Sequence, residues 1–126
     1  MREQEFIGRL NRLGGFGSKD EAMKVLSATA ATMWERLPDG QMECLAAALP
    51  AGIAAAFEKP AGTRGESFSV EEFMSRVSRR AEEPMQQTVR HVRAVAEVIQ
   101  EAVPAEVMNE VYATLPYDIR QLFYAR

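Results

Sequence analysis

Five arginines are the residues whose type and spacing come nearest to a chemical function in this chain. They are Arg76, Arg79, Arg80, Arg90 and Arg93. The first three share one face of a predicted helix, and the last two lie a turn apart on the next helix. Guanidinium groups bind carboxylate and phosphate through paired hydrogen bonds, so these arginines are candidate contacts for an anion or a partner.

A structural role competes with this interpretation. Glu5 stands four residues before Arg9, and Glu72 stands four residues before Arg76. This order is the favourable one for an ion pair on a helix surface. We therefore predict no specific nucleic-acid binding and keep a ligand or anion site on the arginines as the alternative.

Other candidate chemistry rests on single residues. His91 is the only histidine and Cys44 the only cysteine. We expect His91 at the surface or its boundary and Cys44 partly buried as a packing residue, although a Cys44–His91 nucleophile pair stays open. The glycines of residues 14–17 lack the preceding strand and the Gly-Lys-Ser/Thr ending of a phosphate loop. We expect no metal, no cofactor and no catalytic residue.

Aromatic residues offer a second candidate contact surface. Trp34 falls at the edge of a predicted apolar stripe. Tyr117 and Tyr124 occupy positions that Ala51 and Glu58 hold in the first half of the chain. Aromatic side chains are enriched where proteins bind one another, so these three are candidate partner contacts.

Composition predicts one globular domain. The 126 residues are 47% hydrophobic and carry a net charge of −3 from 15 basic and 18 acidic groups, with neither half strongly charged. We expect neither a membrane span nor a secretory signal, because no apolar run is long enough and the first residues are polar. A single cysteine fits a reducing compartment, so we predict a cytoplasmic protein.

The elements that must position these residues are helices arranged as a repeat. Residues 49–57 share Leu, Pro, Ile and Phe at the same spacing with residues 115–123, at an offset of 66. Proline fits the first turn of a helix, and Ile and Phe then fall on one face. Each copy therefore predicts a corner followed by a short helix anchored to a core.

The same offset organises the rest of the chain into an all-α fold of about eight helices. Repeat one spans residues 1–58, a linker spans 59–67, and repeat two spans 68–126. Capping boxes are predicted at Ser18 and Ser69, each with a glutamate three residues later. The sixth helix is expected to open at Pro84 with Met85 first in its buried seam. We expect two four-helix units in one domain, packed about a pseudo-twofold axis.

The motifs resemble a known bacterial family. Glu72-Phe-Met-x-Arg76-Val77, then Val92-Arg-Ala-Val95, then Leu115-Pro116 with Leu122-Phe123, are similar to the domain of unknown function 2267 family (DUF2267). The resemblance implies a tandem duplication in which each half starts and ends on such motifs. It implies a fold and no established activity.

We therefore predict a non-enzymatic helical module that binds an unknown partner protein or self-associates. The alternatives are a small-ligand or anion binder and, third, a hydrolase-like enzyme. A binding module should expose an apolar or aromatic patch, whereas an enzyme should show a pocket with convergent polar groups.

Overall fold

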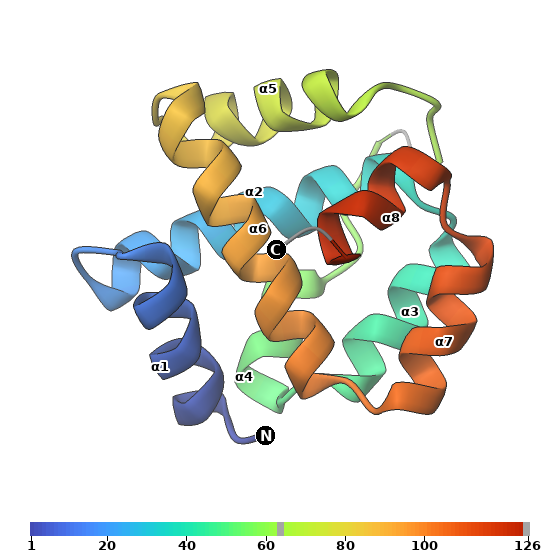
Figure 1. Ribbon diagram of the computed structural model, residues 1–126, viewed down its shortest axis with the longest axis horizontal. Coiled ribbons are helices and arrows are strands. Elements are labelled where there is room, and N and C mark those ends of the chain that lie inside the picture. Colours follow the sequence, from blue (N-terminus) through green and yellow to red (C-terminus); the bar gives the residue numbers. More distant parts are fainter. Residues whose placement is uncertain (63–64, 125–126) are drawn as a thin grey trace.

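The computed structural model describes residues 1–62 and 65–124, excluding the side chains of Thr114 and Tyr124. Within these ranges the chain is helical and has no strand. The helices follow one another as α1 (Glu3–Gly14), α2 (Lys19–Arg36), α3 (Asp39–Ala48), α4 (Ala51–Ala54), the 3₁₀ turn η1 (Ala55–Phe57), α5 (Val70–Ala81), α6 (Met85–Ala102), α7 (Ala105–Thr114) and α8 (Tyr117–Tyr124). The predicted all-α helical bundle is confirmed (Figure 1).

Each predicted capping box forms in part. Ser18 Oγ accepts a hydrogen bond from the Glu21 amide, and Ser69 Oγ accepts one from the Glu72 amide, both at 3.1 Å. The return bonds differ from the prediction. Glu21 accepts from the amide of Gly17 instead of Ser18, and the Glu72 carboxylate binds Arg76. The serines alone satisfy one free amide at each helix start.

Both Leu-Pro corners are present. Leu49 and Leu115 have extended backbones before their prolines, as steric contact with the proline ring requires. The short segment that follows buries its phenylalanine, Phe57 in η1 and Phe123 in α8. The first copy tightens into a 3₁₀ turn, whereas the second stays α-helical. The corners therefore act as packing devices, as predicted.

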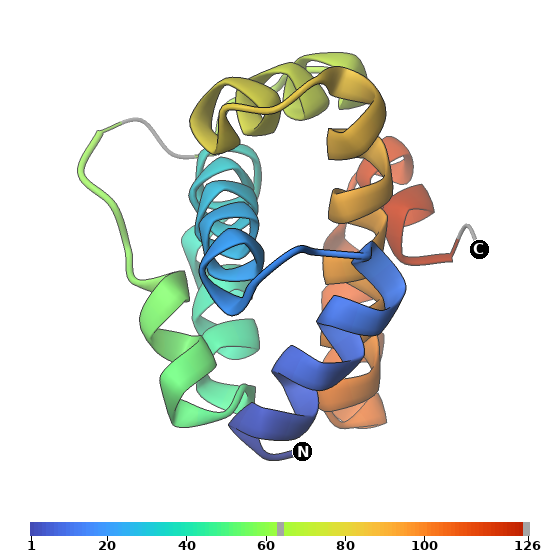
Figure 2. The same ribbon diagram turned by 90° about the vertical axis from the view of Figure 1, so that its left-hand side faces the viewer.

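The two halves interlock. The first helix of the chain, α1, packs chiefly on α6 of the second half, and α5 packs chiefly on α2 of the first half. Figure 2 shows that the end of η1 and the start of α5 lie at opposite sides of the molecule. The halves are therefore joined through helices that are far apart in the sequence, while the duplication itself stays a prediction.

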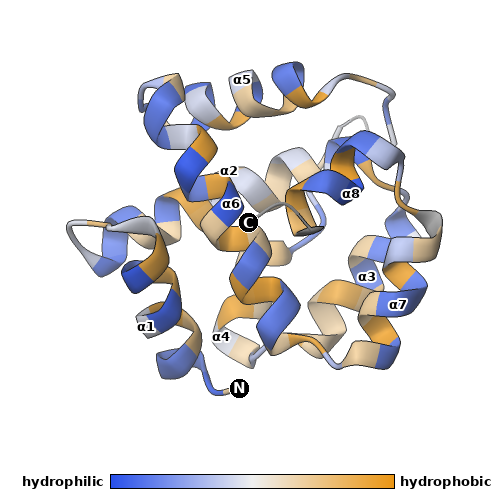
Figure 3. Ribbon diagram, viewed as in Figure 1, coloured by the Kyte–Doolittle hydropathy of each residue, from blue (hydrophilic) through white to orange (hydrophobic). Residues whose placement is uncertain are grey.

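One continuous apolar core results. The helices turn hydrophobic residues inward and hydrophilic residues outward, as α5 shows most clearly (Figure 3). The prediction for Met85 is wrong, because its side chain is 44% exposed. Met85 lies in the first turn of α6, which begins at the rim of the molecule (Figure 1). Among the described residues, the other large hydrophobic side chains that are exposed are Met1 and Tyr117.

Candidate functional site: the groove between α1 and α6

The arginines of α5 face carboxylates. Arg80 donates to both oxygens of Glu35, at 2.8 and 2.6 Å, and to Thr32 Oγ1 at 2.7 Å. Arg76 lies 3.2 Å from the same Glu35 carboxylate. The hydrogen bonds of Arg80 are the main reason why the pKa of Glu35 is lowered. This group of charges ties α5 to the end of α2.

Arg76 has further partners on its other sides. Its Nε donates to Glu72 at 2.8 Å, its Nη1 donates to Glu66 at 3.2 Å, and its guanidinium stacks 3.9 Å from the ring centre of Phe68. The pKa of Arg76 is raised, chiefly by the hydrogen bond to Glu72. An anion would have to displace these carboxylates, so the geometry favours a structural role. Arg79 is exposed and lies 3.6 Å from Glu72.

The arginines of α6 are placed differently. Arg90 and Arg93 are both exposed, and no ion pair joins either one to a carboxylate of the described residues. Both line a solvent-open groove of about 380 Å³. The rest of its lining is Leu13, Gln86, Val89, Ala94 and Glu97. The groove thus combines two arginines that form no ion pair among the described residues with half-buried Leu13 and Val89 and buried Ala94.

The packing of α1 on α6 forms this groove. Arg9 of α1 holds Glu101 of α6 through two hydrogen bonds, at 2.9 and 2.7 Å. Figures 1 and 2 both show α1 alongside α6. At the end of α1, Gly15 is left-handed at φ 65°, and a Cβ there would lie 2.8 Å from Arg90 Nη2. A glycine therefore lets the α1–α2 loop approach the Arg90 guanidinium.

His91 is buried, so the prediction of a surface or boundary position is wrong. Its side chain is 6% exposed, and its Nδ1 lies 3.0 Å from both oxygens of Glu83. Thr88 Oγ1 donates to Glu83 at 3.1 Å, and the ring of Phe16 packs 4.2 Å from the His91 ring. The α1–α2 loop covers the histidine, and this contact between distant segments was not readable from α6 alone. The available signal was that Thr88 and His91 lie three residues apart, and so on one face of α6, shortly after Glu83.

Cys44 is exposed, so the prediction of a partly buried packing residue is also wrong. It lies on α3 beside Glu110 and Val111 of α7. The thiol is exposed because it lies on the side of α3 away from its buried residues Met42 and Leu45. The contacts of His91 are Glu83 and Phe16, so the structure does not assemble a Cys44–His91 pair.

The aromatic candidates differ in their exposure to solvent. Trp34 is only 2% exposed, and its Nε1 donates to the Phe57 carbonyl oxygen at 2.9 Å. Its predicted contact role is corrected: the η1 turn folds over the indole and makes it a core residue. Tyr117 is exposed on α8. The Tyr124 side chain lies outside the described residues.

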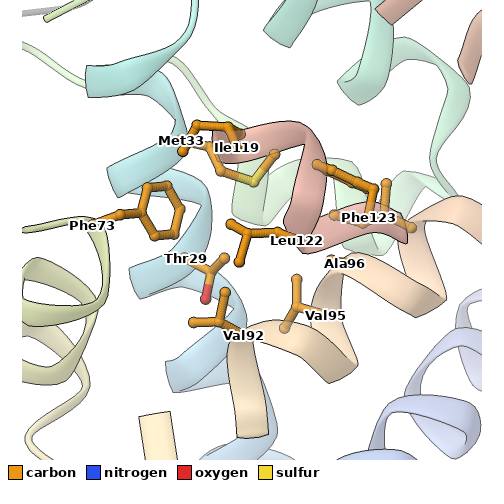
Figure 4. A pocket seen from close by; sticks show the side chains of 10 residues that line it. Thr29, Met33, Phe73, Val92, Val95, Ala96, Ile119, Leu122 and Phe123 are labelled. Carbon is orange, nitrogen blue, oxygen red and sulfur yellow. The ribbon is translucent and has the colours of Figure 1, made fainter. Parts of the chain in front are cut away.

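An internal void lies beneath α8, where α2, α5 and α6 meet it (Figure 4). Its lining is apolar apart from Thr29, whose hydroxyl donates to the Val25 carbonyl oxygen. The void measures about 10 Å³, close to the smallest space that holds one water. It is a packing defect of the core and not a ligand pocket.

Two further observations concern metal binding and membrane insertion. Within residues 1–62 and 65–124, no group of three His, Cys, Asp or Glu side chains has a metal-binding arrangement. Among the described helices, none combines the length and apolar character needed to cross a membrane.

The family to which the chain belongs follows from a comparison of its sequence with family models. No curated protein matches the sequence. The family described as "Uncharacterized conserved protein (DUF2267)" matches residues 3–122, which is nearly the whole chain. The resemblance drawn from the sequence motifs is thereby confirmed, and the chain belongs to the DUF2267 family.

Proposed function

We propose that this domain is a non-enzymatic protein-interaction module whose contact surface is the groove between α1 and α6. The observation that carries the proposal is the pair Arg90 and Arg93. Both are exposed without an ion-pair partner among the described residues, and both flank an apolar floor. Interface cores commonly combine arginine with apolar contact area.

The remaining polar groups support a binding role over catalysis. The side chains of His91 and Glu83 are only 6% and 8% exposed, and Phe16 packs against the His91 ring. Arg76 and Arg80 are held by carboxylates between α2 and α5. An acid–base catalyst must reach the proton that it transfers, which these packed groups do not favour.

Binding of a small anion is a second candidate function, because the same two guanidiniums could hold a phosphate or carboxylate. Glu97 lies in the groove and lowers its positive potential. The groove is also open along its length, whereas small-ligand sites enclose most of the ligand surface. A longer, partly apolar occupant fits this shape better.

The test is selection of binders from a displayed library of helical peptides of about 15–20 residues, long enough to hold a helix. Selected peptides should bind the domain and lose affinity for the double variant Arg90→Glu, Arg93→Glu. The control is Lys19→Glu, Arg79→Glu, which makes the same change in net charge at exposed positions outside the groove. Failure to recover any peptide whose binding depends on the groove would contradict the proposal.

A further inference from the structure

We infer that the partner of the groove is an acidic amphipathic helix of another protein, which lies along α6 with two carboxylates facing Arg90 and Arg93. This inference rests on the proposed function and specifies the chemistry of the partner. It follows from the charge, the spacing and the floor of the groove.

Charge selects the sign of the partner. Arg90 and Arg93 have no ion-pair partner among the described residues, so a carboxylate brought into the groove would bind them without displacing a carboxylate of these residues. Each guanidinium can hold a carboxylate through two parallel bonds. A basic partner would meet two like charges, which disfavours it.

Spacing selects a helix. Groove residues run from Gln86 to Glu97 on α6, a length of about 16 Å at 1.5 Å per residue. Arg90 and Arg93 lie one turn apart. A helix packed along α6 presents side chains at the same interval, so two acids at i and i+3 or i+4 would meet the two arginines together.

The apolar floor of the groove and Glu97 at its end determine the other features of the partner helix. Leu13 and Val89 are half buried and pack against the core, so they offer apolar area for a leucine-rich stripe. Glu97 lies in the groove one turn beyond Arg93. Glu97 should repel an acidic residue of the partner helix that faces it and should favour a lysine or a neutral residue. The partner helix is therefore expected to lie with its acidic pair at Arg90 and Arg93 and its lysine at Glu97, which sets its direction.

The experiment compares three helical peptides that share a leucine stripe. The first has a pair of glutamates facing Arg90 and Arg93 and a lysine facing Glu97. The second replaces both glutamates by glutamine, and the third replaces the lysine by glutamate. Binding of each is measured by fluorescence anisotropy at low and physiological salt, and the helical library described above is sequenced for acidic pairs.

The first peptide should bind about five- to tenfold more tightly than the second, and the difference should shrink as salt rises. The variant Arg90→Gln, Arg93→Gln should bind the first two peptides equally, whereas the Lys19→Glu, Arg79→Glu control should keep the difference. The third peptide should bind the Glu97→Gln variant better than the unchanged domain.

A different occupant of the groove would give different results in these binding experiments. Groove-dependent peptides without an acidic pair, or equal binding of the first two peptides, would overturn the acidic partner and leave the interaction module standing. Absence of every groove-dependent peptide would overturn both proposals. Binding of inorganic phosphate to the groove, without peptide binding, would identify a small-anion site. Concentration-dependent dimers that the Arg90→Gln, Arg93→Gln variant abolishes would identify a second copy as the occupant.

Discussion

Gly15 and Glu82 share a left-handed backbone conformation directly after a helix, one in each half of the chain. Each ends the first helix of its half in the left-handed conformation, at φ 65° and φ 55° respectively. They are 67 residues apart, the offset at which the first helices of the predicted repeats align. One half uses glycine, for which this conformation carries no steric cost, and the other uses a glutamate.

Exchanging residue types at this position should change stability in opposite directions. Gly15→Ala should destabilise the fold by about 1–2 kcal/mol, because the new Cβ is strained and lies against Arg90. Glu82→Gly should stabilise it, because the loss of strain outweighs an exposed ion pair with Lys24. Urea unfolding of both variants measures the two effects, and equal destabilisation by both would refute the assignment of strain to Glu82.

Acid should weaken the contact between α2 and α5. The Glu35 carboxyl has a pKa below its ordinary 4.5, mainly because Arg80 donates hydrogen bonds to its charged form. A lowered pKa means that the stabilisation is complete above about pH 4.5 and is lost as pH falls through the lower folded value. Glu35→Gln should cost about 1–2 kcal/mol at pH 7.

The measurement is the free energy of unfolding between pH 7 and pH 3 for both proteins. The two curves should converge in acid, since the variant has no carboxylate to protonate at this position. A constant gap between the curves would show that the charge of Glu35 is not the source of the stabilisation. Glu71→Gln, an exposed change on the neighbouring α5, serves as the control.

The buried pair of Glu83 and His91 should be sensitive to a change that leaves its shape intact. Glu83→Gln keeps the volume but removes the carboxylate that faces Nδ1 of His91 and accepts from Thr88. The expected loss is about 1.5–3 kcal/mol, the range for hydrogen bonds to a charged group. Glu82→Gln, the adjacent exposed position, should change thermal stability little. Equal melting midpoints for the two variants would contradict a structural role for the pair.

The N-terminal half should not fold alone. Residues 1–62 contain α1, whose main packing partner is α6, and α2, whose main partner in the other half is α5. Isolation would expose the buried faces of Phe6, Leu10 and Val25 to water. Circular dichroism should show a weak, broad melt for this fragment and one cooperative transition for the full chain. A sharp melt of the fragment would contradict the interlocked packing.

Local signals in the sequence were sufficient for much of the fold. The apolar spacing of Phe6, Leu10 and their counterparts identifies helices, and Ser18 and Ser69 mark two helix starts. The Leu-Pro corners restrict the backbone of two adjacent residues. Each of these signals works through neighbours within a few positions, so sequence alone could predict the elements and their approximate ends.

Tertiary packing decided which of the candidate site residues are buried in the core and which are exposed to solvent. Trp34 and His91 are buried because η1 and the α1–α2 loop cover them, and Cys44 is exposed on α3. In the sequence the arginines are all charges on a helix face and cannot be told apart. In the structure Arg80 pairs with Glu35 of α2, whereas Arg90 lines the groove beside α1. The physical reason is that burial and ion pairing depend on segments tens of residues apart, whose approach is set by the packing of the whole core rather than by local periodicity.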